Sequence, residues 1–168
     1  MVYLIGYMGA GKTTIAKLLA EQLHLPFYDT DQEIEKKEKR SVSEVFKKDG
    51  ELYFRILETE LLIQFNTKAV IACGGGIPIH NNNMDIINTK GISFYLKASA
   101  NCLANRLKEK TQSRPLITKI PENELEPYIK KELQKRSSFY NLAHYTILVD
   151  DKNKEDILRE IHTLISTL

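Results

Sequence analysis

A glycine-rich segment near the start of the chain carries the clearest chemical signal. Residues 6–14 read Gly-Tyr-Met-Gly-Ala-Gly-Lys-Thr-Thr, which completes the pattern G-x-x-x-x-G-K-[ST]. The segment follows the apolar run 2–5 and precedes a helical pattern, which is the strand, loop and helix context that the motif requires. Backbone N–H groups and a helix N-terminus favour bound phosphate at such a loop. The alternative, a glycine-rich turn with an exposed lysine, does not account for the flanking strand and helix.

The motif predicts which part of a bound nucleotide its residues contact. Lys12 is expected to reach the β- and γ-phosphates, and the hydroxyl of Thr13 is expected to ligate Mg²⁺. The residues expected to bind the nucleotide are Gly9, Ala10, Gly11, Lys12, Thr13 and Thr14.

Two aspartates, Asp29 and Asp31, stand where the second predicted strand ends. Ligands of open α/β sheets bind beyond the carboxyl ends of the strands. Carboxylates one residue apart on an extended segment point the same way, so one could approach the metal while the other accepts a hydroxyl proton. The alternative is that both cap the next helix, whose N-terminus attracts anions. The nearby phosphate loop favours the functional interpretation.

Three glycines, Gly74, Gly75 and Gly76, follow the third predicted strand. Glycine lets a ligand approach the backbone closely, although a flexible connector would have the same composition. This strand does not end in the aspartate that usually holds the metal in phosphate-loop proteins, so Asp29 is the nearest candidate for that role.

Two arginines fall on predicted helix faces that should point inward. Arg136 shares a helical stripe with Leu133 and Tyr140, and a buried arginine needs an internal carboxylate or a bound anion. Arg55 lies at the edge of an apolar face, where an ion pair with Glu58 is the simpler explanation. Two guanidinium groups that converge on one carboxylate would form a recognition site for a small acid.

Two further arginines are candidates for the nucleotide side. Residues 108–126 contain two prolines and little periodicity, which indicates a lid or binding loop, and Pro127 suits the first turn of the next helix. Arg114 in this loop could neutralise charge on a transferring phosphoryl group. Arg106, on the helix before it, could contact the nucleotide. The alternatives are a solvated loop arginine and a surface arginine.

Alternating strand-like and helical patterns predict how these residues are held. Such alternation is typical of a parallel sheet covered by helices. Ser41 and Ser99 are expected to cap helices, and Gly50 is expected to separate two of them. The predicted strands are 2–5, 26–29, 69–73, 92–97 and 145–149, and the longer predicted helices are 12–23, 31–40, 51–65, 127–140 and 154–168.

Composition narrows the class of protein. The length of 168 residues suits one domain, and a net charge of +2 gives no reason to expect nucleic-acid or membrane binding. No apolar run is long enough for a membrane span, and no signal peptide precedes the first strand, so a cytoplasmic protein is expected. Cys73 and Cys102 lack metal or redox spacing and are expected to be reduced thiols.

Taken in order, the motifs resemble those of shikimate kinases along essentially the whole chain. They are G-x-M-G-x-G-K-T at 6–13, D-T-D at 29–31, F-R-x-x-E at 54–58, G-G-G at 74–76, R-P-L at 114–116 and R-x-x-x-Y at 136–140. The resemblance implies a three-layer α/β P-loop kinase fold with a five-stranded parallel sheet and helices on both faces. It implies a single domain over 1–168, with substrate-binding helices at about 31–60 and a lid at about 108–124.

The resemblance also implies an activity, which is phosphorylation of the shikimate 3-hydroxyl by ATP with one Mg²⁺ ion, in aromatic amino acid biosynthesis. A monomer that binds neither nucleic acid nor membrane is expected. By likeness, the catalytic residues are Lys12, Asp31 and Arg114; the shikimate-binding residues are Asp31, Arg55, Gly75, Gly76 and Arg136; the nucleotide contacts include Arg106 and Arg114; and the metal-binding residues are Thr13 and Asp29.

Some features depart from the family, and other functions remain open. Ala72 and Cys73 replace the serine or threonine that many members carry before the glycines, and residues 150–154 lack the arginine of some relatives. A kinase for another small acceptor, such as gluconate or a nucleoside monophosphate, is one alternative. A nucleotide-dependent switch that signals to a protein partner is another, although no base-specificity motif is recognisable.

Overall fold

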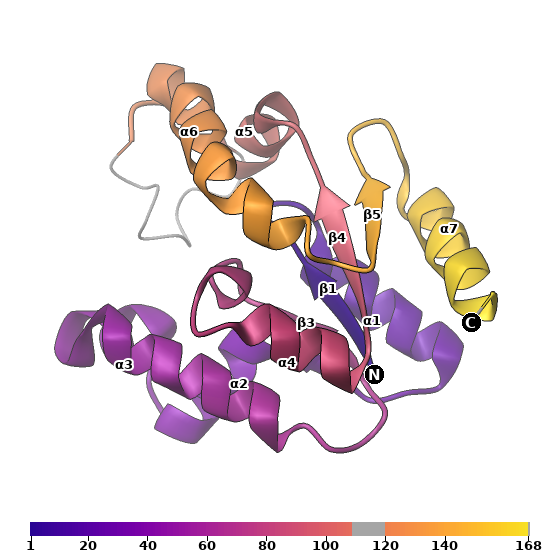
Figure 1. Cartoon of the computed structure of the whole chain (residues 1–168). Helices are drawn as coiled ribbons and strands as arrows, with labels where there is room; N and C mark the ends of the chain where they lie inside the picture. Colours follow the sequence, from indigo (N-terminus) through magenta and orange to yellow (C-terminus); the bar gives the residue numbers. More distant parts are fainter. Residues whose placement is uncertain (109–119, 168) are drawn as a thin grey trace.

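Five parallel strands form one sheet in the order β2-β3-β1-β4-β5 (Figure 1). The computed structural model describes residues 1–108 and 120–167. Central β1 is buried along its whole length and pairs Val2 with Val70 and with Ile92, as expected for a strand covered on both faces. The strands are β1 (Val2–Ile5), β2 (Phe27–Asp29), β3 (Val70–Ala72), β4 (Ile92–Lys97) and β5 (Tyr145–Leu148).

Helices cover both faces of this sheet, which confirms the predicted fold class. α1 (Lys12–Leu23) and α7 (Lys154–Ser166) pack together on one face, and α4 (Asn83–Lys90) and α6 (Glu122–Tyr140) cover the other (Figure 1). The remaining helices are α2 (Thr30–Glu38), α3 (Val42–Gln64), the 3₁₀ turn η1 (Ile77–Ile79) and α5 (Ala100–Lys108). Among the residues described, no helix combines the length and the apolar character that crossing a bilayer requires.

The predicted boundaries are closely matched for the strands and less well for the helices. α6 begins at Glu122, so the expectation that Pro127 stands in its first turn is wrong. Glu122 and Glu124 favour an earlier start, because acidic side chains stabilise a helix N-terminus. The predicted lid at about 108–124 therefore ends inside α6, and residues 109–119 of it lie outside the described part. Neither η1 nor α4 was predicted.

A small second core holds α2 and α3 together apart from the sheet. Ile34 of α2 packs with Val45, Phe54 and Leu57 of α3, and all four side chains are buried. This pair of helices carries Asp31 at one end and Arg55 in the middle. The packing therefore fixes these two residues relative to each other.

Gly50 interrupts α3, as the sequence predicts. Its φ of 84° and ψ of 173° lie in a region that is essentially restricted to glycine. The part of α3 that precedes Gly50 begins at a capping box. In it, Ser41 Oγ accepts from the Glu44 N–H, and Glu44 Oε2 accepts from the Ser41 N–H. The helical segment after Gly50, which carries Arg55, is therefore kinked relative to the segment before it.

Replacement of Gly50 by alanine is expected to lower the free energy of unfolding by about 1–3 kcal/mol, because alanine is strained at this φ and ψ. No atom lies within 4 Å of the added Cβ, so the effect isolates backbone strain from steric overlap. Urea unfolding of the variant measures it. Lys48→Ala, at an exposed neighbouring position, is the control. Equal stability of the two variants would show that the backbone relaxes without cost.

Candidate active site

The phosphate loop joins β1 to α1 and depends on glycine at defined positions. Gly6 has a φ of 139°, and a Cβ there would lie 2.7 Å from the Leu96 carbonyl oxygen. Gly11 has a φ of 96° and caps α1 in the left-handed conformation. Lys12 Nζ donates to the carbonyl oxygens of Gly6 at 2.9 Å and Tyr7 at 3.0 Å. The lysine head group is thus held over the loop where a phosphate would bind.

A cavity of about 880 Å³ opens in front of this loop, at the carboxyl ends of the strands. Its size suits a nucleotide or a drug-sized ligand. Arg55, Gly76 and Arg136 do not line it, and Arg114 lies outside the described residues. The predicted site residues that do line it are Gly9, Ala10, Gly11, Lys12, Thr13, Thr14, Asp29, Asp31, Gly75 and Arg106.

Thr13 and Asp29, the two predicted metal ligands, are in direct contact. Thr13 Oγ1 donates to Asp29 Oδ2 at 2.7 Å, across 16 residues of sequence. Asp29 Oδ1 also accepts from the Asp31 N–H at 3.1 Å and caps α2. Asp29 therefore caps α2 through Oδ1, as the alternative interpretation of the sequence expected. Its other oxygen, Oδ2, reaches Thr13 of the phosphate-loop motif. A hydroxyl and a carboxylate oxygen are hard donors of the kind that Mg²⁺ prefers.

Asp31 lies in the first turn of α2, so the expectation that it shares an extended segment with Asp29 is wrong. Both carboxylates still line the cavity, because the helix begins immediately beyond the strand end. Burial, followed by the charge of Asp29, raises the pKa of Asp31 to about 6, and Lys12 and Arg55 oppose the rise. A carboxylate with such a pKa is a better proton acceptor than an ordinary aspartate.

Activity that depends on ionised Asp31 is expected to decline below about pH 6, approaching a tenfold loss per pH unit. The sign follows from the raised pKa, since acidification protonates the group before an exposed aspartate would titrate. The measurement is kcat/KM for the acceptor at saturating MgATP between pH 5 and 8. The residual activity of Asp31→Asn should lack the inflection. A profile that is flat through pH 6 in the unsubstituted protein would contradict this assignment.

The glycine triplet packs against charged side chains, so it is more than a flexible connector. The Gly74 N–H donates to Thr30 Oγ1 at 2.8 Å. A Cβ at Gly74 would lie 2.5 Å from Asp31 Oδ1 and 3.0 Å from Glu58 Oε1. A Cβ at Gly76 would overlap the guanidinium of Arg55. Glycine here lets two carboxylates and an arginine gather around bare backbone.

Arg55 forms ion pairs with two glutamates of its own helix, α3. Its Nη1 lies 2.7 Å from Glu58 Oε2, and its Nη2 lies 2.9 Å from Glu51 Oε1. Glu58 is 1% exposed, and burial raises its pKa against the opposing charge of Arg55. The intrahelical ion pair that sequence offered as the alternative is therefore present. It also holds the guanidinium against Gly76.

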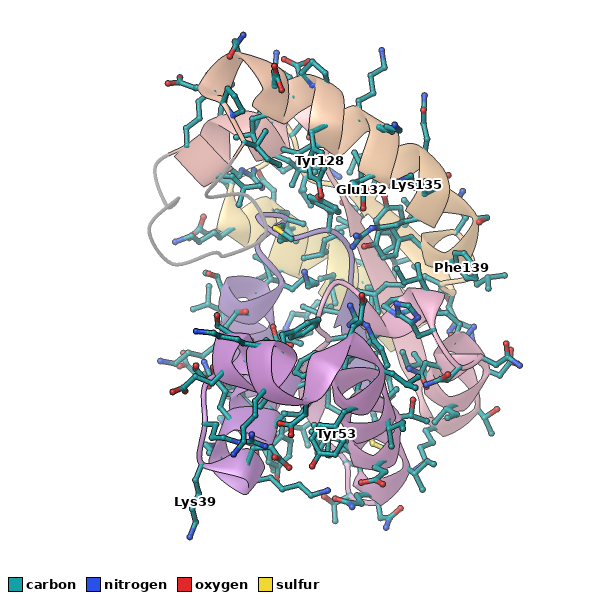
Figure 2. The ribbon with its side chains drawn as sticks, turned by 90° about the vertical axis from the view of Figure 1, so that its left-hand side faces the viewer. Lys39, Tyr53, Tyr128, Glu132, Lys135 and Phe139 are labelled. Carbon is teal, nitrogen blue, oxygen red and sulfur yellow. The ribbon has the colours of Figure 1, made fainter. Side chains whose placement is uncertain are left out.

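Arg136 likewise has an internal partner, because its Nη2 lies 2.7 Å from Glu132 Oε2. Its guanidinium also stands over the ring of Tyr7, 5.2 Å from the centroid. Glu132 and Tyr128 follow each other along α6, one helical turn apart (Figure 2), and both act electrostatically on Tyr7. The phosphate loop and α6 thus meet at Arg136.

Arg55 and Arg136 come close to one histidine that sequence reasoning missed. Burial lowers the pKa of His80, and the charges of Arg55 and Arg136 lower it further. His80 stands at the end of η1, and its Nε2 lies 3.9 Å from Glu51 Oε1, which is also the partner of Arg55. A histidine four residues beyond Gly76 gave no pattern by which to find it.

Arg106 reaches the loop and the last strand from α5. Its Nη1 donates to the Gly9 carbonyl at 3.4 Å, and its Nη2 donates to the Val149 carbonyl at 3.1 Å. Lys152, Asn153 and Lys154 line the same cavity and were not predicted as site residues. Their position after β5, at the carboxyl end of a parallel strand, was the available signal.

Comparison with known proteins agrees with this geometry. The sequence model of the shikimate kinase family matches residues 8–166. The shikimate kinase of Flavobacterium johnsoniae is 40% identical over 169 residues, which cover 98% of each chain. The crystal structure of shikimate kinase from Bacteroides thetaiotaomicron is 33% identical with a TM-score of 0.90, covering 98% of this chain and 97% of that one.

A second solved structure holds the substrate that gives the family its name. It is shikimate kinase from Acinetobacter baumannii in complex with shikimate, 33% identical with a TM-score of 0.89, covering 99% of this chain and 92% of that one. A family match over nearly the whole chain and relatives of this identity leave no doubt about kinship: the chain belongs to the shikimate kinase family.

Proposed function

We propose that this protein transfers the γ-phosphoryl group of ATP to the 3-hydroxyl of shikimate, a step of aromatic amino acid biosynthesis. One observation carries the proposal beyond kinship. The charges of Lys12, from the phosphate loop, and of Arg55, from α3, both act on the carboxylate of Asp31. A group in that position can align a hydroxyl between a nucleotide and an anionic acceptor.

Phosphoryl transfer asks a protein mainly for positioning and for stabilisation of charge. Asp31 orients the acceptor hydroxyl and accepts its proton. Lys12 exchanges the carbonyl oxygens of Gly6 and Tyr7 for phosphate oxygens. Arg114, outside the described residues, is assigned on family likeness to neutralise charge on the moving group.

Arg55 and Arg136 hold the acceptor carboxylate, with backbone contacts from Gly75 and Gly76. Glu51 is 60% exposed, so the substrate carboxylate can replace it on Nη2 of Arg55. Glu58 is buried and stays in place on Nη1, which keeps the guanidinium oriented during the exchange. Arg55 can therefore bind the substrate carboxylate while it keeps its ion pair with Glu58, because only Glu51 has to be displaced.

The residues present fit one Mg²⁺ ion. Thr13 would supply its hydroxyl and Asp29 a carboxylate oxygen, acting through water as family likeness suggests. When bound, the ion neutralises charge on the β- and γ-phosphates. Arg106 and the segment from Lys152 to Lys154 would face the nucleotide. We further propose a cytoplasmic monomer with one domain, in which helices within about 31–60 bind the acceptor.

ADP release from the purified protein with ATP and Mg²⁺ tests the proposal, with and without shikimate. Release that depends on shikimate supports it. Release with gluconate or a nucleoside monophosphate in place of shikimate would identify a kinase for another acceptor. Release that no small molecule stimulates, together with nucleotide-dependent capture of a protein partner, would favour a switch.

A further inference from the structure

Tyr140 ends α6 and touches several parts of the site without lining the nucleotide cavity. Its side chain is fully buried, and its hydroxyl donates to the Gly75 carbonyl oxygen at 2.8 Å across 65 residues of sequence. Its ring packs on Tyr95 of β4 with centroids 5.0 Å apart. The bond therefore ties the helix of Arg136 directly to the glycine triplet.

The hydroxyl remains a donor at physiological pH. Burial raises the pKa of Tyr140 to about 12, and the charge of Arg136 opposes part of the rise. The phenol thus lies beside the Arg136 guanidinium, one helical turn along α6. A single oxygen stands next to the arginine and on the backbone of the triplet.

This bond also fixes a second peptide group. The peptide between Gly75 and Gly76 is planar and trans, so fixing the Gly75 carbonyl fixes the direction of the Gly76 N–H. Gly76 is the residue on which the Arg55 guanidinium packs. Tyr140 and one peptide plane therefore connect Arg136 to Gly76, the backbone against which the Arg55 guanidinium packs.

We infer that Tyr140 is a positioning residue that sets, through its hydroxyl, how Arg55 and Arg136 are placed around the glycine triplet for a carboxylate-bearing acceptor. The inference rests on the proposed function, because it takes the two arginines as the acceptor-carboxylate site. It differs from a plain packing role, since the ring would satisfy packing without its oxygen. Other hydrogen bonds hold the two flanking glycines, since the Gly74 N–H donates to Thr30 and the carbonyl oxygens of Gly74 and Gly76 accept from the N–H groups of Ile77 and Ile79. The bond from Tyr140 holds the carbonyl of the middle glycine, Gly75.

Tyr140→Phe tests the inference, because it removes the oxygen and keeps the ring on Tyr95. We expect the KM for shikimate to rise about tenfold, as when a buried acceptor loses its donor, with the KM for ATP changed less than about twofold. Tyr3→Phe is the matched control, since Tyr3 is also fully buried and its hydroxyl donates only weakly, to the Met1 sulfur. Thermal unfolding of both variants sets a temperature at which each is fully folded.

A double-mutant cycle separates positioning from a general loss of order. If the hydroxyl acts through the arginine, Tyr140→Phe added to Arg136→Ala should raise the shikimate KM far less than it does alone. Full additivity in this cycle and in the corresponding cycle with Arg55→Ala, an unchanged KM in Tyr140→Phe, or equal rises in both KM values would overturn the inference while the kinase assignment stands. Absence of shikimate-dependent ADP release in the unsubstituted protein would instead overturn the proposed function, and the inference with it.

Discussion

Replacement of Asp31 by asparagine is expected to lower kcat about 1,000-fold and to leave ATP affinity nearly unchanged, within the usual range for loss of a general base. The amide has almost the same shape, so the start of α2 and its cap from Asp29 should survive. It cannot accept the hydroxyl proton, and it removes the charge that Lys12 and Arg55 face. Steady-state ADP release and nucleotide titration measure the two effects.

Asp85→Asn is the control for this variant, because Asp85 is an exposed aspartate in the first turn of another helix. It should retain full turnover. Undiminished turnover in Asp31→Asn would show that Asp31 is a capping-region residue without a catalytic role. A parallel loss of ATP affinity would assign it to nucleotide binding.

The same substitution carries a stability signature of opposite sign. Burial raises the pKa of Asp31 from 3.8 to about 6, so the folded state binds the proton more tightly than the unfolded chain does. Ionised Asp31 therefore destabilises the fold, in part between those values and fully above about pH 6. Asp31→Asn should unfold at a higher temperature than the unsubstituted protein at pH 8, with the gain vanishing below the unfolded pKa. A lower unfolding temperature at pH 8 would contradict the raised pKa.

Replacement of Arg136 by alanine is expected to raise the KM for shikimate about 100-fold, the scale of one lost charge-assisted pair. The KM for ATP should change far less, because Arg136 does not line the nucleotide cavity. Arg136→Lys should recover part of the loss, since it restores the charge without the planar fork. Initial rates with each substrate varied in turn measure these values.

Arg159→Ala removes an arginine that is 76% exposed and paired with Asp156 on the surface, so both KM values should stay unchanged. Equal rises in both KM values for Arg136→Ala would mean that the arginine serves the fold through Glu132 and Tyr7. Loss of stability without a change in either KM would lead to the same conclusion.

The sequence by itself determined the features that depend on neighbours along the chain. The phosphate loop, the break at Gly50 and the capping box at Ser41 are local, because backbone conformation and a few adjacent side chains decide them. The central strands β1 and β3 were found because buried parallel strands are continuously apolar. The same local reasoning placed Asp29 at a strand end beside the loop, where it now meets Thr13.

Tertiary structure decided the rest, because those features join residues far apart in sequence. No local pattern shows that Tyr140 would hold Gly75, that Arg106 would reach the Val149 carbonyl, or that burial would raise the pKa of Asp31. Local reasoning even misjudged α6, since Pro127 favours a helix start wherever the preceding residues do not already form one. Burial and pairing depend on which elements pack together, and the distances that set the charges of this site exist only after the sheet and its helices have assembled.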